Sequence, residues 1–432
     1  MPTLSIDLPT SAPPAETARP TFYSWVVFAL TFGLLISDYM ARQVLNAVFP
    51  LLKAEWALSD TSLGALSGVV ALTVGLLTFP LSLLADRWGR IRSITLMAIL
   101  WSIATLACGM ARSYEQMFVG RLLLGLGEAA YGSVGIAVVV SVFPKSLRAT
   151  LSAAFMAGGL FGQVLGVGLG GWIADAHGWR AAFIAIALAG LAMALVYPLV
   201  VGEKRTEVLA RRFGNDSDGS DRKRPSLKGL FERRSLVFAY LGSGTQLYVA
   251  GALTAWLPTY FHNYYGLSIG AAGQRAALFL AASGAGMVLC AMLSDRLSKG
   301  RAAAKYDVAI ACCLSCALTI GVAFALAPGP AQLGALAIGA FFAAASCGPA
   351  GAMVANLTSA RIHATAFATL TVANNALGLA PGPILTGRLA DSWALADALA
   401  ILPIAAVAAA LLFWIGRRTY PTDLAANASS TD

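Results

Sequence analysis

Twelve long apolar stretches constrain this chain more than any other feature of its sequence. Each contains a run of roughly 17–25 residues, the length that an α-helix needs to cross the hydrocarbon core of a bilayer. Only 12% of the residues are charged, whereas a soluble protein has about 25%. We therefore expect an all-α integral membrane protein with twelve transmembrane helices in two six-helix bundles. The stretches fall at 22–50, 61–84, 92–111, 116–143, 148–173, 181–201, 236–262, 275–294, 306–327, 332–355, 364–388 and 397–416.

The polar segments divide the chain into five parts. Residues 1–21 are rich in Pro, Ser and Thr and lack the basic-then-apolar pattern of a signal peptide, so they are predicted to form a disordered cytoplasmic tail. The N-terminal bundle spans 22–201 and the C-terminal bundle spans 236–416. Between them, 202–235 is polar and is predicted to be a flexible cytoplasmic linker. Residues 417–432 form a second cytoplasmic tail.

Basic residues are concentrated on one side of the predicted membrane. With the N-terminus inside, 23 of the 30 Lys and Arg residues fall on the cytoplasmic side, which places both termini in the cytoplasm. The formal charge of +9 is then mainly a topology signal. Binding of anionic lipid headgroups by the linker is a secondary possibility, and no nucleic-acid partner is expected. The sequence predicts a multi-pass plasma-membrane protein, which in a bacterium means the inner membrane.

A short motif recurs at corresponding places in the two bundles. SLLADRWGRIR at 82–92 and AMLSDRLSKGR at 291–301 each join an apolar helix end to Asp-Arg and further basic residues. Such a repeat, here 209 residues apart, is typical of transporters built from two parallel-related bundles. The candidate gate residues in these loops are Asp86, Arg87, Arg90, Asp295 and Arg296.

Four charged residues lie inside apolar helices of the N-terminal bundle. Asp38 and Arg42 are four residues apart, and Arg121 and Glu128 are seven apart, so each pair lies on one helical face. A charge at the bilayer centre costs at least about 2.5–3.5 kcal/mol, so these side chains should face other helices or a water-filled cavity. Arg binds carboxylate or phosphate in a bidentate manner. The protonation of a carboxylate in such a cavity depends on whether an Arg approaches it.

We therefore expect Arg42 and Arg121 to bind an anionic substrate, and Glu128 and Asp38 to couple protons to its movement. The alternative is a buried charge network that only locks the N-terminal bundle together. In the C-terminal bundle no acid or base falls in the middle of a helix. A cavity that is charged on one wall and mostly apolar on the other would suit an amphiphilic anion. The weaker substrate-binding candidates in this bundle are Gln246, Tyr248, Trp256, Asn374 and Asn375.

Two further patterns concern the backbone. Pro381 and Pro383 interrupt the eleventh stretch and would free backbone carbonyls toward the cavity. The fifth stretch has GxxxG spacing, which lets helices approach closely. Its helix-packing candidates are Gly158, Gly162, Gly166 and Gly170.

These motifs resemble the major facilitator superfamily, over about residues 22–416. LADRWGRIR looks like its signature loop between helices two and three, although Ser82 and Ala291 stand where the pattern usually has Gly. The resemblance implies that this loop latches the cytoplasmic side in the outward-facing state. By the same resemblance, Asp86 meets the start of the eleventh helix, its neighbouring arginines pair with acidic residues, and the glycine run packs the fifth helix.

Within the superfamily, the chain is similar to the Spinster-like branch, and bacterial organic-anion symporters come next. The similarity is carried by SDTSLGALSG at 59–68, RLLLGLGEA at 121–129 and GWRAAF at 178–183. It implies that Glu128 carries the proton. The family usually has Asp directly before the first-helix Arg, where this chain has Ala41, and Asp38 is the nearest acid.

The sequence therefore predicts a monomeric secondary active transporter, moving a small organic or amphiphilic anion with protons by alternating access. One alternative is a Spinster-like transporter of lysolipids or sphingoid phosphates, and another is a membrane receptor without flux. No enzyme is expected, because no nucleophile–base pair, phosphate loop or ATPase domain is present. No metal or cofactor is expected either. Cys313 and Cys316 form a CxxC in an apolar run without a neighbouring His or second pair, so they are interpreted as packing residues.

Overall fold

The computed structural model describes residues 20–213, 230–299, 301, 303–358 and 362–429. Its described part is helical throughout apart from short connections, with no strand, and it contains eleven helices long and apolar enough to cross a membrane. The predicted all-α membrane fold is confirmed. The remaining predicted stretch, the eleventh at 364–388, is also helical, but it consists of consecutive shorter pieces around residues 363–392.

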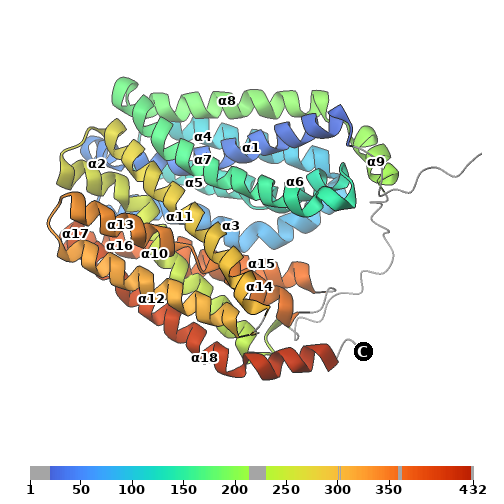
Figure 1. Ribbon diagram of the computed structural model, residues 1–432. Coiled ribbons are helices and arrows are strands. Elements are labelled where there is room, and N and C mark those ends of the chain that lie inside the picture. The colour runs from blue at the N-terminus through green and yellow to red at the C-terminus, as the bar shows by residue number, and fades with distance from the viewer. Residues whose placement is uncertain (1–19, 214–229, 300, 302, 359–361, 430–432) are drawn as a thin grey trace, which may run out of the picture.

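The two halves of the chain form two groups of helices, which lie one above the other in Figure 1. In that view α2, α16 and α17 lie at one end and α9 and the C-terminus at the other. We call these the far end and the terminal end. The N-terminal helices are α1 (Phe22–Ala47), α2 (Phe49–Trp56), α3 (Asp60–Trp88), α4 (Arg90–Met110), α5 (Tyr114–Glu128), α6 (Tyr131–Ser141), α7 (Arg148–His177) and α8 (Trp179–Val200).

The C-terminal half has the corresponding elements. Its helices are α10 (Arg234–Tyr265), α11 (Ile269–Ser298), α12 (Ala304–Ala325), α13 (Pro330–Ala343), α14 (Cys347–Leu357), α15 (His363–Asn374), the π-helical turn η3 (Asn375–Leu379), α16 (Pro381–Ser392), α17 (Leu395–Ala400) and α18 (Leu402–Ser429).

Several predicted stretches are divided in the structure. The stretch at 116–143 is broken between α5 and α6, where the helix stops at Glu128 and restarts at Tyr131. The stretch at 332–355 is broken in the same way between α13 and α14. In the eleventh stretch the backbone widens into η3 just before Pro381. A π-helical turn accommodates the missing proline N–H by shifting the hydrogen-bond register.

The linker and the C-terminal tail differ from expectation. Residues 203–212 form the helix α9 (Glu203–Arg212), in which Thr206 and Leu209 are buried. The prediction of a flexible linker is therefore wrong for this part, while 214–229 and the tail at 1–19 lie outside the described residues. The last helix does not end near 416 but continues to Ser429. Asp423 in this extension accepts hydrogen bonds from the Ser235 N–H at 2.9 Å and hydroxyl at 2.6 Å, which ties it to the start of α10.

Candidate functional site

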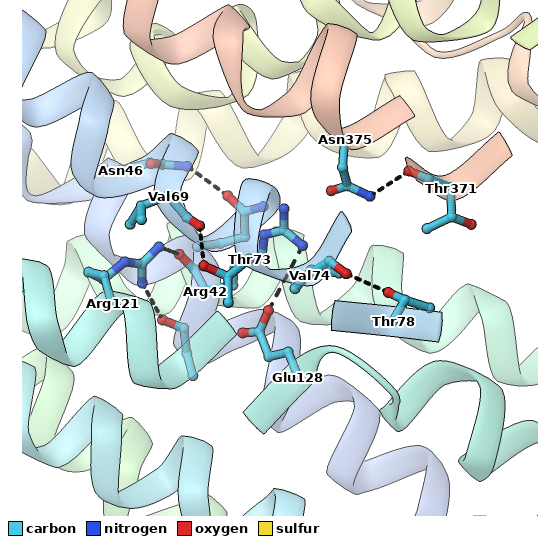
Figure 2. Close-up of polar contacts among 12 residues, drawn as sticks. Arg42, Asn46, Val69, Thr73, Val74, Thr78, Arg121, Glu128, Thr371 and Asn375 are labelled. Carbon is cyan, nitrogen blue, oxygen red and sulfur yellow. Dashed lines mark hydrogen bonds and ion pairs between the residues drawn. The ribbon is translucent and has the colours of Figure 1, made fainter. Parts of the chain in front are cut away.

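The four charged residues predicted from the sequence come together between α1 and α5. The Arg42 guanidinium lies 3.9 Å from the Glu128 carboxylate (Figure 2), with side-chain exposures of 15% and 3%. Asp38 and Arg121 are 6% and 0% exposed. Arg42 is thus the least buried side chain of the cluster.

Asp38 and Glu128 form a pair of buried carboxyl groups. They are close enough to interact with each other, and both interact with Arg42. Among the described residues, Asp38 Oδ1 and Glu128 Oε1 are buried without a hydrogen-bond partner. A buried acceptor without a donor costs about 1–3 kcal/mol. A proton shared between the two carboxyls would supply the missing donor.

Arg121 has a different role from Arg42. Its guanidinium donates to the carbonyl oxygens of Leu66, Ala41 and Arg42, at 3.1, 3.2 and 2.9 Å. These bonds join α5 to α1 and α3 and engage all three guanidinium nitrogens. Figure 2 shows the bond to the Arg42 carbonyl. In this conformation Arg121 therefore braces the backbone around Arg42 with three of its five N–H donors.

Polar side chains surround the pair of Arg42 and Glu128. Asn46 donates to Gln43 at 2.7 Å on the next turn of α1. From the other half, Asn375 in η3 donates to the Thr371 carbonyl at 2.9 Å, and it appears beside this region in Figure 2. A Cβ at Gly75 of α3 would lie 2.9 Å from the Asn375 Cβ, so the two halves meet closely here.

The remaining C-terminal candidates are mostly bonded within their own half. Gln246 is fully buried and donates to the Ala343 carbonyl at 3.1 Å. Asn374 accepts from Ser243 at 2.8 Å. Trp256 is fully buried and donates to the Pro383 carbonyl at 3.0 Å. The Pro383 carbonyl oxygen is thus bonded to Trp256, while Tyr248 on α10 is half-buried.

The four predicted packing glycines of α7 all face α1. A Cβ at Gly162 would lie 2.6 Å from the Ile36 carbonyl oxygen, and one at Gly166 would lie 2.8 Å from the Met40 Cα. At Gly158 and Gly170 it would crowd the side chains of Phe32 and Val44, each at 2.8 Å. These contacts hold α1, and with it Asp38 and Arg42, at a fixed distance from α7.

The candidate gate loops lie toward the terminal end. Asp295 pairs with Lys305 at 3.8 Å, while the side chains of Arg87 and Arg296 are exposed. The Asp86 side chain lies outside the described residues. Arg92 pairs with Glu203 of α9 at 3.9 Å, which places the linker helix against the loop that includes Arg90. This contact was not anticipated, because α9 itself was not.

The sequence analysis also missed two acidic residues that connect the halves, Asp175 and Asp391. No group of three or more His, Cys, Asp or Glu residues suited to a metal ion occurs in the described part of the chain.

The fold and the intramembrane charge cluster define a polytopic protein built from two halves around a central polar site. The family model described as Major Facilitator Superfamily matches residues 31–330, and the chain belongs to that family. Its family and curated relatives are transporters rather than enzymes.

Three curated relatives illustrate the range of similarity. The "Probable L-galactonate transporter" of Escherichia coli (strain K12) is 28% identical over 278 residues, which cover 63% of this chain and 61% of that protein. The "Hexuronate transporter" of Bacillus subtilis (strain 168) is 22% identical, covering 85% and 87%. "Protein spinster homolog 3" of Danio rerio is 27% identical, covering 57% and 50%. Both groups named from the sequence motifs thus occur among the relatives.

A solved structure shows the same fold. A bacterial homologue of the human lysosomal transporter Spinster, described as inward-facing and unoccupied, has a TM-score of 0.79 at 21% identity, covering 93% of this chain and 98% of that one. The predicted two-bundle fold is therefore confirmed.

Proposed function

We propose that this protein is a proton-coupled secondary transporter of small organic anions that works by alternating access. The observation that carries the proposal is the Arg42 guanidinium, which is partly exposed beside the buried Glu128 carboxylate. An arginine at this depth requires a counter-ion. An anionic substrate can replace Glu128 as that counter-ion if Glu128 takes up a proton.

The second carboxyl group makes this exchange possible. Asp38 and Glu128 share one accessible arginine, and each has a buried oxygen without a donor among the described residues. We propose that a proton enters this pair as the substrate carboxylate binds Arg42. The pair would then lose the proton on the side where the substrate leaves, which couples the two movements.

The relatives support the chemical class of the substrate. Two are named for galactonate and hexuronate, and a third is the "Probable galactarate/D-glucarate transporter GudP" of Bacillus subtilis (strain 168). All these names describe carboxylates of small size. We propose the bacterial inner membrane as the location, with the terminal end in the cytoplasm.

Replacement of Glu128 by Gln is expected to abolish proton-driven accumulation. One pH unit corresponds to about 1.4 kcal/mol per proton, so coupling to one proton supports about tenfold accumulation of substrate. Glu128→Gln removes the titrating group and should reduce this ratio to that of passive equilibration. Uptake of labelled glucuronate, galactonate and gallate into proteoliposomes with an acidic exterior would measure it.

The same variant also tests substrate binding. In purified protein, thermal stabilisation by the transported anion should depend on pH between 5 and 8 in wild type and lose that dependence in Glu128→Gln. Glu115→Gln is a suitable control, because Glu115 is an exposed acid at the start of the same helix. Unchanged accumulation in Glu128→Gln would refute its coupling role and make Asp38 the candidate.

A lipid-like substrate is the second candidate. An apolar groove of about 440 Å³ opens between α7 and α11, lined by Val164, Leu165, Gly168, Leu169, Trp172, Gln274 and Ala277. A single acyl chain could enter the site through such a groove. Stabilisation by lysophosphatidylcholine or sphingosine phosphate, without stabilisation by small carboxylates, would favour this function. Binding without flux of any probe would favour a receptor.

A further inference from the structure

A five-residue motif recurs near the far ends of α7 and α16. GWIAD at 171–175 and GRLAD at 387–391 each place Asp four residues after Gly, and the two copies are 216 residues apart. The helices that face them also correspond. Both α3 and α11 begin after a serine cap, Ser59 and Ser268, whose hydroxyl accepts from the N–H three residues later.

The first contact joins α16 of the C-terminal half to α3 of the N-terminal half. Asp391 Oδ1 accepts from the Asp60 N–H at 2.6 Å. Its Oδ2 accepts from the Thr61 N–H at 2.9 Å and from the Thr61 hydroxyl at 2.5 Å. The carboxylate therefore caps the first turn of α3, where free N–H groups and the helix dipole favour negative charge.

The second contact is the counterpart of the first. Asp175 at the end of α7 accepts from the Ser268 hydroxyl at 2.8 Å, at the start of α11. A Cβ at Gly270 would lie 2.9 Å from the Asp175 Oδ2, so this carboxylate also lies over a helix N-terminus. Here α7 belongs to the N-terminal half and α11 to the C-terminal half.

The glycines beside these acids show that the two contacts are equivalent. A Cβ at Gly387 would collide with the Asp60 carbonyl oxygen, and one at Gly171 would lie 3.1 Å from the corresponding oxygen of Ile269. On the facing helices, a Cβ at Gly64 would collide with the Pro383 carbonyl oxygen.

One further glycine completes this correspondence. A Cβ at Gly273 of α11 would lie 2.8 Å from the Val167 carbonyl oxygen. This contact corresponds to that of Gly64 with Pro383, with Gly273 in the place of Gly64 and Val167 in the place of Pro383. Equivalent positions differ by 209 residues between α3 and α11 and by 216 between α7 and α16. The far end is therefore closed by two related seams, each with backbone contact through glycine and a carboxylate at its outer edge.

We propose that Asp175 and Asp391 are paired latches that hold the far end closed. Each belongs to one half and binds a helix N-terminus of the other half, so opening the far end must break both. The other ion pairs at this end among the described residues each lie within one half. Lys53 pairs with Asp60 at 2.6 Å, and Glu55 pairs with Arg180 at 2.7 Å, all within the N-terminal half.

The two latches differ in strength. Asp391 accepts three hydrogen bonds, two of them from backbone N–H groups, whereas Asp175 accepts one from a side chain. Loss of Asp391 should therefore release the far end more than loss of Asp175. Loss of both should increase the population with an open far end by about the product of the two single increases, because the two seams share no residue.

Distance measurements between spin labels test the proposal without a substrate. Labels would be attached to Ala54→Cys and Ala394→Cys, exposed positions at the far end of opposite halves, in a background without the six native cysteines. A carboxylate at a helix N-terminus contributes about 0.3–1 kcal/mol, which corresponds to a factor of about two to five in the equilibrium between the closed and open far end. Asp391→Asn should increase the long-distance population by this factor, and Asp175→Asn/Asp391→Asn by about four to twenty-five.

The control is Glu55→Gln, which removes a hydrogen-bonded carboxylate at the same end but within one half. Its distance distribution should match that of wild type. If Asn retains the hydrogen bonds, the corresponding double Ala variant, with its melting temperature checked, decides the outcome. A double Ala variant that is folded and has the wild-type distribution would overturn the latches. Because no substrate is present, this result is independent of the proposed transport function.

Discussion

Replacing Arg42 with Gln should weaken binding of the transported anion by about ten- to a hundredfold. A hydrogen bond to a charged group contributes about 1.5–3 kcal/mol, and 1.4 kcal/mol corresponds to a factor of ten in affinity. The Arg42 guanidinium is the accessible cation of the cluster, with 15% side-chain exposure. Gln keeps one donor group but neither the charge nor the bidentate fork. Calorimetric titration of purified protein with the best carboxylate of the panel would measure the change.

Two matched variants make this test specific. Arg42→Lys keeps the charge without the planar fork, so its affinity should be intermediate. Arg388→Gln removes an exposed arginine on α16 and should leave the affinity unchanged. If Arg42→Gln binds the anion within threefold of wild type, Arg42 is not the anion ligand, and the charge cluster is best explained as a structural network.

Replacing Arg121 with Met should destabilise the protein by about 3 kcal/mol or more. The fully buried guanidinium donates to three backbone carbonyl oxygens on α1 and α3. Removing it loses three hydrogen bonds from a charged donor, which contribute about 1.5–3 kcal/mol each before the structure relaxes, while the carbonyls keep their intrahelical N–H donors. Unfolding in detergent, followed by circular dichroism against denaturant, would measure the loss.

Arg121→Lys separates bracing from binding. One ammonium group cannot reach three carbonyls in the geometry of a guanidinium, so this variant should also lose stability while any folded fraction still binds the anion. Arg42→Gln should show weaker binding and a smaller loss of stability than Arg121→Lys, because the buried carboxyls that it leaves can be neutralised by a proton. If Arg121→Lys instead keeps full stability and loses binding, Arg121 is a substrate ligand and not a brace.

Hydropathy and repetition were sufficient to predict much of this fold. Apolar stretches of membrane-spanning length identified every long helix, and the repeated loops around Asp86 and Asp295 indicated two related halves. Helix breaks inside apolar stretches were not predictable in the same way. Ala129 and Ala130 separate α5 from α6 although Ala is a strong helix former, so tertiary packing overrides propensity there.

The site was predictable in its members but not in their roles. Helical spacing placed Asp38, Arg42, Arg121 and Glu128 on facing surfaces, and the structure brings them together. Spacing cannot show where a long side chain ends, and two arginines of equal charge meet different surroundings. Arg121 reaches the carbonyls of neighbouring helices, which are present in any sequence and leave no signal in it.

All four charges of the site belong to the N-terminal half, and this has a consequence for how transport can be engineered. In a rocking mechanism each half moves as one body, so proton and anion would travel on the same body and need no signal from the other. The C-terminal half would then act as a wall that shapes the cargo. A chimera with the C-terminal half of a relative should change which anions are carried while the dependence on protons stays the same.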